Sequence, residues 1–348
     1  MSVFENDYFD QHEVIAYHED GDTGLRAIIA IHNTALGPAL GGCRMWPYAS
    51  EEDALVDVLR LSRGMTYKAA ISGIPFGGGK AVIIGDSRTQ KTGASMRAYG
   101  RFVDTLGGRY LTAEDVGTTV ADMKQVRATT RHVRGFGDGS QDPSPTTAYG
   151  VFIGIKAALA YRFGIDSVSR RTVAVQGLGN VGMQLVRYLA EEGASLIVAD
   201  LDRGRVESAI REYGAAAMAA ERIHQADVDV FAPCALGAVV NDTTVDEIMA
   251  EIVAGSANNQ LVGPEHGLRL MERGILYAPD YVINAGGVID VAGEGPDYRL
   301  EDVMSRVARI GGTLGDIFER AAQEGRPPER IADVIAEERF KESRKQAA

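Results

Sequence analysis

Three residues in the first half of the chain have side chains and surroundings suited to acid–base chemistry. Lys68 lies in the apolar segment MTYKAA, and Lys80 ends the glycine-rich segment GIPFGGGK. Segments of this composition are usually buried, and a buried ammonium group costs free energy unless an acid pairs with it. A buried lysine also gives up its proton more readily, so it can take part in catalysis near neutral pH. Asp115, in TAEDVGT at the end of a strand-like run, is the candidate partner. The alternative is a salt bridge with a structural role only.

A second group of residues, between Thr172 and Asp200, has the spacing of a dinucleotide-binding unit. The apolar run TVAVQ predicts a buried strand, GLGNVG supplies three glycines, and a helical apolar pattern follows. A second apolar run then ends on Asp200. A GxGxxG motif alone is a weak signal. A strand before it, a helix after it and an acidic residue at the end of the next strand make it a strong one.

The positions of this unit have separate physical roles. Gly177 permits the tight turn from strand to helix, Gly179 lets a pyrophosphate approach the backbone, and Gly182 lets helix and strand pack closely. The N–H groups at the helix N-terminus suit phosphates. Asp200 would accept hydrogen bonds from the ribose hydroxyls and repel a 2′-phosphate, so we expect NAD rather than NADP. We assign four neighbours to the same cofactor site: Leu178, Asn180, Val181 and Leu201. The alternative is a strand–turn–helix that binds no ligand.

Composition excludes several classes of protein. A length of 348 residues suggests two domains. A net charge of −12 argues against binding to nucleic acid or to an anionic membrane. Two cysteines are too few for a disulfide framework, which favours a reduced, cytoplasmic setting. We find no signal-peptide core and no apolar run of the roughly 18 residues that a membrane span needs. The six histidines are scattered without metal-ligand spacing, so we expect no metal.

The first half of the chain predicts a mixture of strands and helices. Ser50 is a plausible N-cap for a helix that should end near Arg63 and Gly64. Helices are expected at 94–106 and 122–130. The expected strands are 13–20 and 25–33, which form a hairpin, then 65–72, 77–85 and 107–117.

The second half alternates strand-like and helical patterns, as a parallel sheet requires. Residues 134–146 are rich in Gly and Pro and predict a hinge, and a long helix follows at 147–163. Further helices are expected at 300–324 and at the C-terminal end. We therefore predict an α/β protein of two domains separated by a cleft: an N-terminal mixed α/β catalytic domain and a C-terminal Rossmann-type NAD-binding domain. The expected boundaries are 1–134 for the catalytic and oligomerisation domain, 135–326 for the NAD-binding domain, and 327–348 for a C-terminal helix that packs back on the first domain.

Seven motifs spread over nearly the whole chain carry a resemblance to a known family. They are PALGGCR, IPFGGGKAVI, TAEDVGTT, DPSPTTAYG, APCALGA, AGSANNQL and YAPDYVINAGGVI. With the GLGNVG turn, they resemble the amino-acid dehydrogenases of the glutamate, leucine, phenylalanine and valine dehydrogenase superfamily. The resemblance implies reversible, NAD-dependent oxidative deamination of an L-amino acid to a 2-oxo acid and ammonia, in a homo-oligomer that is an octamer or smaller.

The resemblance also implies roles for single residues in the substrate site. Lys68 would hold the substrate α-carboxylate, Lys80 would activate water, and Asp115 would exchange protons with the amino group. Gly41 would contribute a backbone contact to the substrate, and we assign Met65, from the segment of Lys68, to the same site.

Four residues after the hinge are implied to contact the cofactor. Thr147 would hydrogen-bond the carboxamide, and Ala235 would lie along the cofactor. Asn258 would contact the substrate and the nicotinamide ribose. Asn284 would lie beside the nicotinamide and the carboxylate.

The resemblance places four residues around the substrate side chain: Leu40, Ala113, Val288 and Val291. Glutamate-specific members carry a lysine where this chain has Leu40, and an apolar residue cannot repay the desolvation of a side-chain carboxylate. The branched residues keep the pocket narrow, so we expect leucine, isoleucine and valine as substrates. The alternative is phenylalanine or another aromatic amino acid.

Two other classes of protein compete with an amino-acid dehydrogenase. A dinucleotide-binding regulator or structural oligomer with an inactive site should lack one of Lys68, Lys80 and Asp115, and all three are present. A metalloenzyme should show a ligand motif such as HExxH, which the sequence does not contain.

Overall fold

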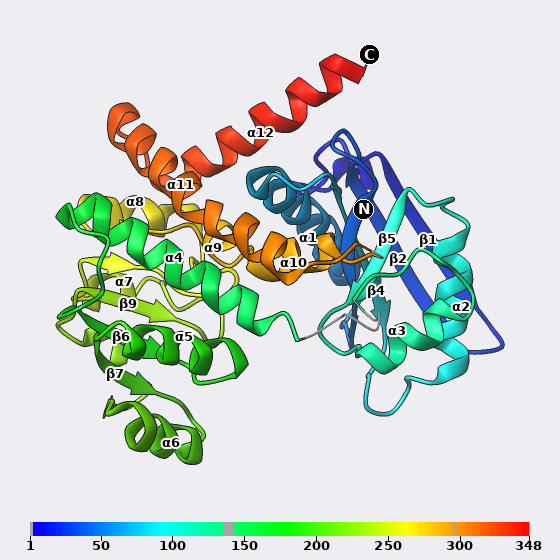
Figure 1. Cartoon of the computed structure of the whole chain (residues 1–348). Helices are drawn as coiled ribbons and strands as arrows, with labels where there is room; N and C mark the ends of the chain where they lie inside the picture. The colour runs from blue at the N-terminus through cyan, green and yellow to red at the C-terminus, as the bar shows by residue number, and fades with distance from the viewer. Residues whose placement is uncertain (1–2, 136–141, 296, 348) are drawn as a thin grey trace. The chain divides into compact units, whose positions relative to one another are not determined.

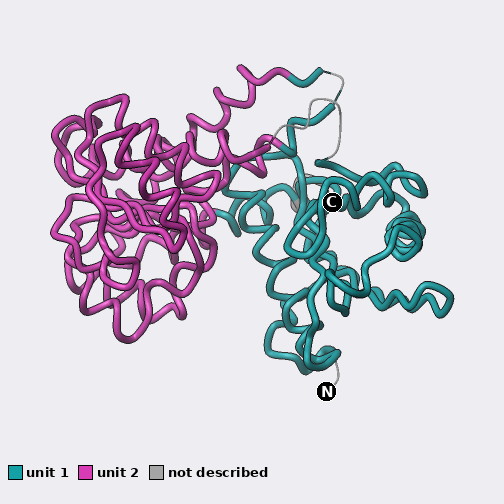
Figure 2. The backbone as a smooth tube through the Cα atoms, turned by 90° about the horizontal axis from the view of Figure 1, so that it is seen from below, with its two compact units in different colours: residues 1–141, 291–298, 336–348 teal, residues 142–290, 299–335 magenta. Residues whose placement is uncertain are grey.

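The computed structural model of the chain describes residues 3–135, 142–295 and 297–347. Contacts divide the chain into two units, which Figure 2 shows in different colours. Unit 1 consists of Met1–Gln141, Val291–Tyr298 and Ala336–Ala348. Unit 2 consists of Asp142–Asp290 and Arg299–Ile335.

Unit 1 is built on a mixed five-stranded sheet in the order β1-β2-β4-β3-β5. β1 and β2 form the predicted antiparallel hairpin, β2 pairs antiparallel with β4, and β3 lies parallel between β4 and β5. The strands are β1 (Val14–Asp20), β2 (Leu25–Asn33), β3 (Ala39–Trp46), β4 (Gly77–Ile84) and β5 (Tyr110–Glu114). The helices are η1 (Val3–Glu5), α1 (Glu51–Ser72), α2 (Gly93–Asp104) and α3 (Val120–Arg127).

Helices cover both faces of this sheet, with α1 on one face and α2 and α3 on the other (Figure 1). Alternate residues along β2 separate the two cores. Ile28 and Ala30 pack with Val58 and Leu59 of α1. The odd-numbered apolar residues of β2 pack instead with the buried residues of α2. Because side chains alternate along a strand, each position of the sheet can be assigned to one face.

Helix α1 is longer than the sequence predicted. The predicted end near Gly64 and the predicted strand 65–72 are both wrong, because α1 runs to Ser72. An interior glycine costs a helix only about 1 kcal/mol. The apolar face continues beyond it, since Tyr67 and Ile71 are buried. The helix ends instead at Gly73, whose φ of 65° is left-handed and whose N–H bonds to the carbonyls of Ala69 and Ala70. Ser50 is the N-cap, as predicted.

Three consecutive glycines let α1 and the neighbouring strands approach β4 closely. A Cβ atom on Gly78 would lie 2.0 Å from the backbone nitrogen of Thr66 on α1. A Cβ on Gly79 would lie 2.8 Å from the Tyr110 ring, on the other face. Both distances are too short for a real Cβ contact, so this part of the strand must carry no side chain.

Unit 2 contains a six-stranded parallel sheet in the order β11-β10-β9-β6-β7-β8. This order is that of a Rossmann sheet, with its switch point between β6 and β9. The predicted α/β class, with one mixed and one Rossmann-type unit, is confirmed. The strands are β6 (Thr172–Gln176), β7 (Ser195–Ala199), β8 (Ala216–Ala217), β9 (Val230–Pro233), β10 (Ile252–Val253) and β11 (Leu276–Tyr277).

The helices around this sheet separate into two groups. Helices α4 and α11 pack against each other, and α4 also packs on α5. On the other side, η2 and the segments around α7 and α8 enclose an apolar core with β9, β10 and β11. The bounds are α4 (Ser144–Phe163), α5 (Asn180–Glu191), α6 (Arg203–Tyr213), η2 (Ile223–Gln225), α7 (Thr244–Glu247), α8 (Pro264–Glu272), α9 (Asp280–Ile283), α10 (Gly286–Gly293), α11 (Leu300–Glu324) and α12 (Pro328–Ala347).

The predicted hinge at 134–146 overlaps with 136–141, which lie outside the described residues. Its last residues are helical rather than loop, because α4 begins at Ser144. Pro145 lies in the first turn of α4. N–H groups in a first turn have no carbonyl partner within the helix, so a proline there loses no hydrogen bond. The helix therefore begins three residues before the predicted start at Thr147.

The C-terminal half of α12 belongs to unit 1 and contacts α1 there. The guanidinium of Arg339 donates hydrogen bonds to the carbonyls of Ala70 and Ile71, at 3.0 and 2.7 Å. Glu337 accepts a 2.8 Å hydrogen bond from the Tyr67 hydroxyl. Arg339 thereby satisfies carbonyls at the C-terminal end of α1, which have no partner within the helix.

Two glycine-to-alanine substitutions should change stability in opposite directions. Gly64→Ala should stabilise the protein by about 1 kcal/mol, because Gly64 is an exposed interior residue of α1 with open space around its Cβ position. Gly78→Ala should destabilise it by about 1–3 kcal/mol, because the new methyl group collides with α1. Thermal unfolding of the two variants and the unmodified protein measures both effects. A Gly78→Ala protein as stable as the unmodified one would contradict the close packing.

Candidate active site

Lys80 and Asp115 form a buried ion pair in unit 1. Lys80 lies on β4, Asp115 directly follows β5, and the Lys80 Nζ is 3.0 Å from the Asp115 Oδ2. The Lys80 side chain is 8% exposed and that of Asp115 is 23% exposed. The structure therefore brings together the two residues that the sequence suggested as partners.

The two residues meet across β3, which lies between their strands. The GG pair of β3 makes this possible. A Cβ on Gly41 would lie 1.8 Å from the Gly79 carbonyl oxygen, and one on Gly42 would lie 2.8 Å from the Asp115 Cβ. A side chain at either position would push β4 or the β5 end away from β3.

Several candidate residues share the face of the sheet that α1 covers. Val82 of β4 packs on that face, so Lys80, two residues away, points to it as well. In β3, Cys43 and Met45 pack on the opposite face. Leu40 and Arg44 therefore point towards α1, and Ala113, paired with Gly42, lies in the same row.

Met65 and Lys68 reach this face from the helix. Both lie on α1, in the segment that was predicted to be a strand, and both are half-buried. Thr66, between them, packs against Gly78 of β4. The structure thus places the two candidate lysines on elements in direct contact, Lys68 on α1 and Lys80 on β4.

Arg44 is a charged neighbour of the pair that our sequence analysis did not identify. Its Nε lies 3.1 Å from the Asp115 Oδ2, and its Nη1 lies 3.0 Å from the Asp57 Oδ2. The Tyr48 hydroxyl donates a 2.6 Å hydrogen bond to the same oxygen of Asp57. The only available signal was the position of Arg44 directly after the segment GGC.

The ionisation of Asp115 follows from these contacts. Burial alone would raise the pKa of its carboxyl, but the charges of Lys80 and Arg44 outweigh burial and hold that pKa below its ordinary value. Asp115 is therefore a carboxylate near neutral pH. The Asp115 carboxylate can accept a proton from a substrate group. The neighbouring cations then favour the release of that proton.

Val291 belongs to unit 1, in the segment Val291–Tyr298. Glu294 anchors this segment to Arg134 and Gly135. Its carboxylate accepts a 2.6 Å hydrogen bond from the Gly135 N–H, and its carbonyl accepts one of 2.5 Å from Arg134. A Cβ on Gly135 would lie 3.9 Å from the Ala113 Cβ. The segment carrying Val291 is thus held beside the end of β5. Val288 lies on α10 in unit 2 and is half-buried.

The glycine turn of unit 2 has the geometry predicted for it. Gly177 follows β6 with a left-handed φ of +95°, and a Cβ there would lie 2.7 Å from that of Ala235, after β9. A Cβ on Gly182 would lie 1.9 Å from the Gly177 carbonyl oxygen. Around Gly179, the N-cap of α5, the nearest group to a Cβ would be the Arg205 guanidinium, at 4.0 Å. The N-terminus of α5 is therefore tightly packed on its inner side and open at Gly179.

Asp200 lies directly after β7, at the carboxyl edge of the sheet. Its Oδ2 accepts a 2.6 Å hydrogen bond from the Leu178 N–H, which joins the acid to the glycine turn. Asn180 and Val181 begin α5, and Leu201, beside the acid, is 85% exposed. These residues form one edge of unit 2 at the switch point of its sheet.

The remaining candidates of unit 2 gather around α10. The Asn284 side-chain amide donates hydrogen bonds of 2.8 Å to the Asn258 Oδ1 and 3.0 Å to the Ser256 carbonyl. The Thr147 hydroxyl lies 2.8 Å from where a Gly287 Cβ would be. Glycines in INAGG thus let α10 approach the N-terminal turn of α4.

Two family models match the chain along most of its length. Residues 11–132 match the dimerisation domain of Glu/Leu/Phe/Val dehydrogenases. Residues 138–207 and 197–295 match the Glutamate/Leucine/Phenylalanine/Valine dehydrogenase model. The chain belongs to the glutamate/leucine/phenylalanine/valine dehydrogenase family. It is thus an oxidoreductase of the amino-acid dehydrogenase type, and the predicted family is confirmed.

Individual members of this family are similar over nearly the full length. A leucine dehydrogenase from Thermoactinomyces intermedius is 51% identical, over 99% of this chain and 95% of its own. One from Geobacillus stearothermophilus is 52% identical, over 96% and 92%. The crystal structure of the L-tryptophan dehydrogenase from Nostoc punctiforme has a TM-score of 0.87 and 46% identity, and the match covers 96% of this chain and 97% of that one.

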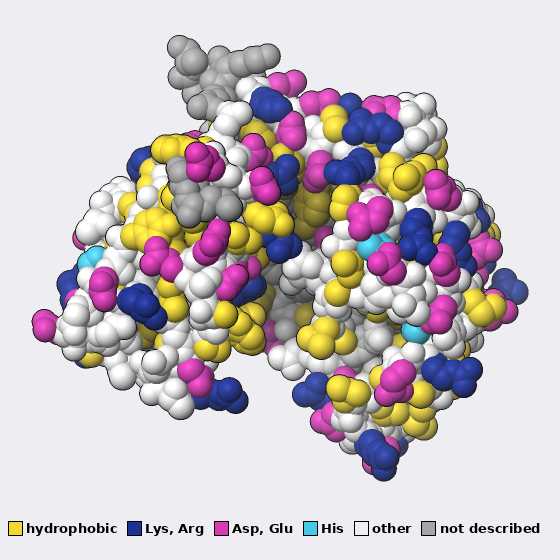
Figure 3. All heavy atoms as spheres, turned by 180° about the vertical axis from the view of Figure 1, so that it is seen from behind, with side chains coloured by type: hydrophobic (Ala, Val, Ile, Leu, Met, Phe, Trp, Pro, Cys, Tyr) yellow, Lys and Arg dark blue, Asp and Glu magenta, His cyan; other side chains and the backbone are white. Residues whose placement is uncertain are grey.

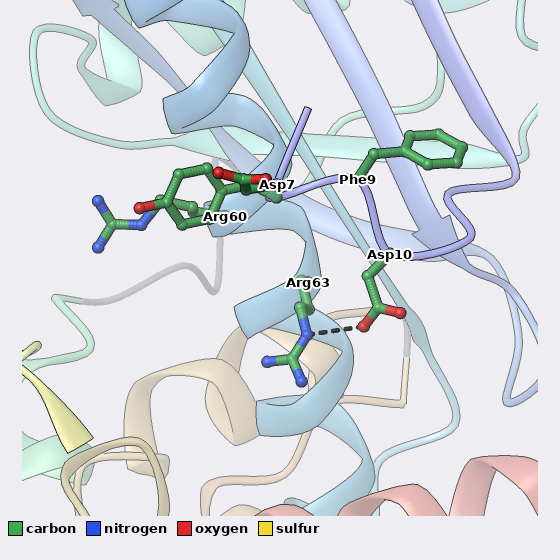
Figure 4. Close-up of a pocket in the computed structure, with 6 residues that line it drawn as sticks. Asp7, Phe9, Asp10, Arg60 and Arg63 are labelled. Atoms are coloured by element: carbon green, nitrogen blue, oxygen red, sulfur yellow. Dashed lines mark hydrogen bonds and ion pairs between the residues drawn. The ribbon is translucent and has the colours of Figure 1, made fainter. Parts of the chain in front are cut away.

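Unit 1 also contains a pocket of about 430 Å³ whose lining includes none of the candidate site residues. It is lined by Asp7, Tyr8, Phe9, Asp10, Arg60 and Arg63. Figure 4 shows Arg60 and Arg63 pointing to different sides, and the Nε of Arg63 is paired with Asp10 at 2.8 Å. Arg63 is therefore engaged by Asp10, and Arg60 lies over the Tyr8 ring, 5.4 Å from its centroid.

The described residues contain neither a cluster typical of a metal site nor a helix suited to span a membrane. Within these residues, we find no group of three or more His, Cys, Asp or Glu side chains placed to hold a metal ion. None of the helices, over the part of the chain described, combines the length and apolar composition needed to cross a membrane. Acidic and basic side chains are interspersed on the face shown in Figure 3.

Proposed function

We propose that this chain catalyses the reversible, NAD-dependent oxidative deamination of branched-chain L-amino acids to 2-oxo acids and ammonia, as a leucine dehydrogenase does. One observation carries the proposal. A buried Lys80–Asp115 pair faces the helix that carries Lys68, in a member of an amino-acid dehydrogenase family. Two cations and one carboxylate suit a substrate that has both a carboxylate and an amine.

The proposed chemistry divides among these three residues. Lys68 binds the α-carboxylate of the amino acid, and the backbone of Gly41 orients it. Asp115 takes a proton from the ammonium group so that a neutral amine can be oxidised to an imine. Lys80 then activates the water that adds to the imine carbon and stabilises the charge that develops there. The adduct expels ammonia as its C–N bond breaks, which leaves the 2-oxo acid. Proton exchange of this kind contributes about 10²–10⁴-fold to a rate.

The edge of unit 2 suits a dinucleotide. Gly179 leaves open space at the N-terminus of α5, where N–H groups favour phosphates. NAD, when bound, supplies the acceptor for the hydride that leaves the substrate Cα. We assign its binding to Gly177–Gly182 and Asp200, with Leu201, Thr147, Ala235, Asn258 and Asn284. Asp200 favours NAD over NADP, because a carboxylate beside the ribose repels a 2′-phosphate.

The side-chain pocket favours branched aliphatic substrates. Leu40 and Ala113 lie on the face that α1 covers, and Val291 is held near Ala113 by the Glu294 contacts. These three residues offer an apolar surface and no cation for a side-chain carboxylate, and the resemblance adds Val288. An aromatic substrate is the second candidate, because an L-tryptophan dehydrogenase is 46% identical to this chain.

We also propose that the protein self-associates, since residues 11–132 match a dimerisation domain. The expected assembly is a homo-oligomer that is an octamer or smaller, and the cytoplasm is the expected compartment. The expected partners are small molecules, namely the amino acid, the 2-oxo acid and ammonia, with neither nucleic acid nor membrane.

A panel of L-amino acids tests the substrate assignment. Reduction of NAD, followed by absorbance, should give the highest kcat/KM for leucine, isoleucine and valine. These three should lie within about 200-fold of one another, because one methylene in an apolar pocket is worth about 1–3 kcal/mol. NADP should support much less turnover. A higher kcat/KM for phenylalanine or tryptophan than for leucine would establish the aromatic alternative.

Substitution of Leu40 tests the pocket itself. Leu40→Lys should lower kcat/KM for leucine by about 10²-fold or more, because it buries an unpaired ammonium group where an apolar side chain should bind. Glutamate turnover should rise relative to leucine turnover. The control is Leu40→Met, which keeps the volume and should lose less than about tenfold. Undiminished leucine turnover in a folded Leu40→Lys protein would remove Leu40 from the site.

A further inference from the structure

Arg44 occupies a position between two carboxylates that nothing in the proposed reaction yet uses. It lies on β3, on the face towards α1, and its guanidinium joins the Asp115 Oδ2 to the Asp57 Oδ2. Asp115 follows β5, and Asp57 comes from α1. One side chain thus connects the candidate proton acceptor to the helix that carries Lys68.

The contacts of Arg44 are stronger than those of a surface ion pair. The side chains of Arg44, Asp57 and Asp115 are 25%, 24% and 23% exposed. Charges partly withdrawn from water interact in a lower effective dielectric than exposed ones. The planar guanidinium also fixes direction, because its Nε and Nη1 each serve a different acid. A lysine has a single ammonium group and cannot reproduce this fork.

The contacts on Asp115 are asymmetric. Lys80 and Arg44 both approach the same carboxylate oxygen, Oδ2, at 3.0 and 3.1 Å. Because the carboxylate is planar, anchoring one oxygen from two directions fixes where the other points. Asp57 in turn is fixed by Tyr48, whose hydroxyl donates to the oxygen that Arg44 contacts.

We propose that Arg44 is a positioning residue for the reaction: it anchors Asp115 through Oδ2, so that Oδ1 is presented to the substrate amine, and it supplies a positive charge that disfavours proton retention on Asp115. This inference rests on the proposed function, in which Asp115 exchanges protons with the amine. Asp57 and Tyr48 support Arg44 from the side of α1.

Arg44 is one of two cations that contact the Asp115 carboxylate, and its charge acts directly on that group. Lys80 faces Asp115 from β4, Arg44 from β3 and, beyond it, Asp57 from α1. Cys43 and Tyr110, on the opposite face, are uncharged near neutral pH because burial raises the pKa of both groups. Burial would lower the pKa of Arg44, but Asp115 and Asp57 outweigh it and raise that pKa, so Arg44 stays charged.

Two substitutions separate the charge of Arg44 from its geometry. Arg44→Gln removes the positive charge beside Asp115, so the Asp115 carboxyl keeps its proton to a higher pH. The acid limb of the kcat/KM profile for leucine should then move up by about one pH unit or more. Arg44→Lys keeps the charge but loses the fork. Its limb should stay near that of the unmodified protein, while kcat falls about tenfold or more.

The ratio of kcat to KM gives a second readout. Since Lys68 still binds the substrate carboxylate, KM for leucine should change by less than about threefold in both variants while kcat falls. Asp57→Asn should shift the profile less than Arg44→Gln, because it removes only the support of Arg44. If Arg44→Gln does not fold, the loss of kcat at a nearly unchanged KM in Arg44→Lys carries the test.

Arg101→Gln is the matched control. Arg101 forms an ion pair of 3.2 Å with Asp20, is 57% exposed, and should leave kcat and the profile unchanged. Arg44 variants that match Arg101→Gln in both readouts, in a protein that deaminates leucine, would overturn the inference. Absence of turnover in the unmodified protein would instead overturn the proposed function. A shift with Gln and none with Lys supports the inference.

Discussion

The buried ion pair between Lys80 and Asp115 is the interaction on which the candidate site of unit 1 depends. Two charges taken out of water need close partners, and here the partners lie on strands separated by β3. They meet because Gly41 and Gly42 have no side chains to keep β4 and β5 apart. The glycines of β4 bring α1, with Lys68, onto the same face. Backbone contact at glycine thus places three charged side chains on one side of a sheet.

The parts of the site that the sequence predicted are those set by local chain geometry. Gly177 adopts the left-handed φ that its motif requires, and Asp200 lies at the end of β7 beside the turn. Lys80 stood out because it ends a glycine-rich segment, and Asp115 because it lies at the end of a strand-like run. The alternation of β and α elements also predicted the parallel sheet of unit 2.

The errors arose where packing outweighed local preference. Residues 65–72 have the composition of a strand and follow a glycine, yet they extend α1 because their buried face packs on β4. Arg44 was overlooked for a different reason. Its partners, Asp57 and Asp115, lie 13 and 71 positions away, and no spacing rule connects them. A residue whose role depends on three separate elements becomes visible only when the register of the sheet is known.

A double-mutant cycle on Lys80 and Asp115 tests most directly whether the pair acts as one catalytic unit. Lys80→Gln and Asp115→Asn should each lower kcat/KM for leucine by about 10²-fold or more. The double variant should then lose little more than the more damaged single variant, since residues that act together are not additive. Losses that multiply in the double variant, or a single variant with full activity, would contradict the account.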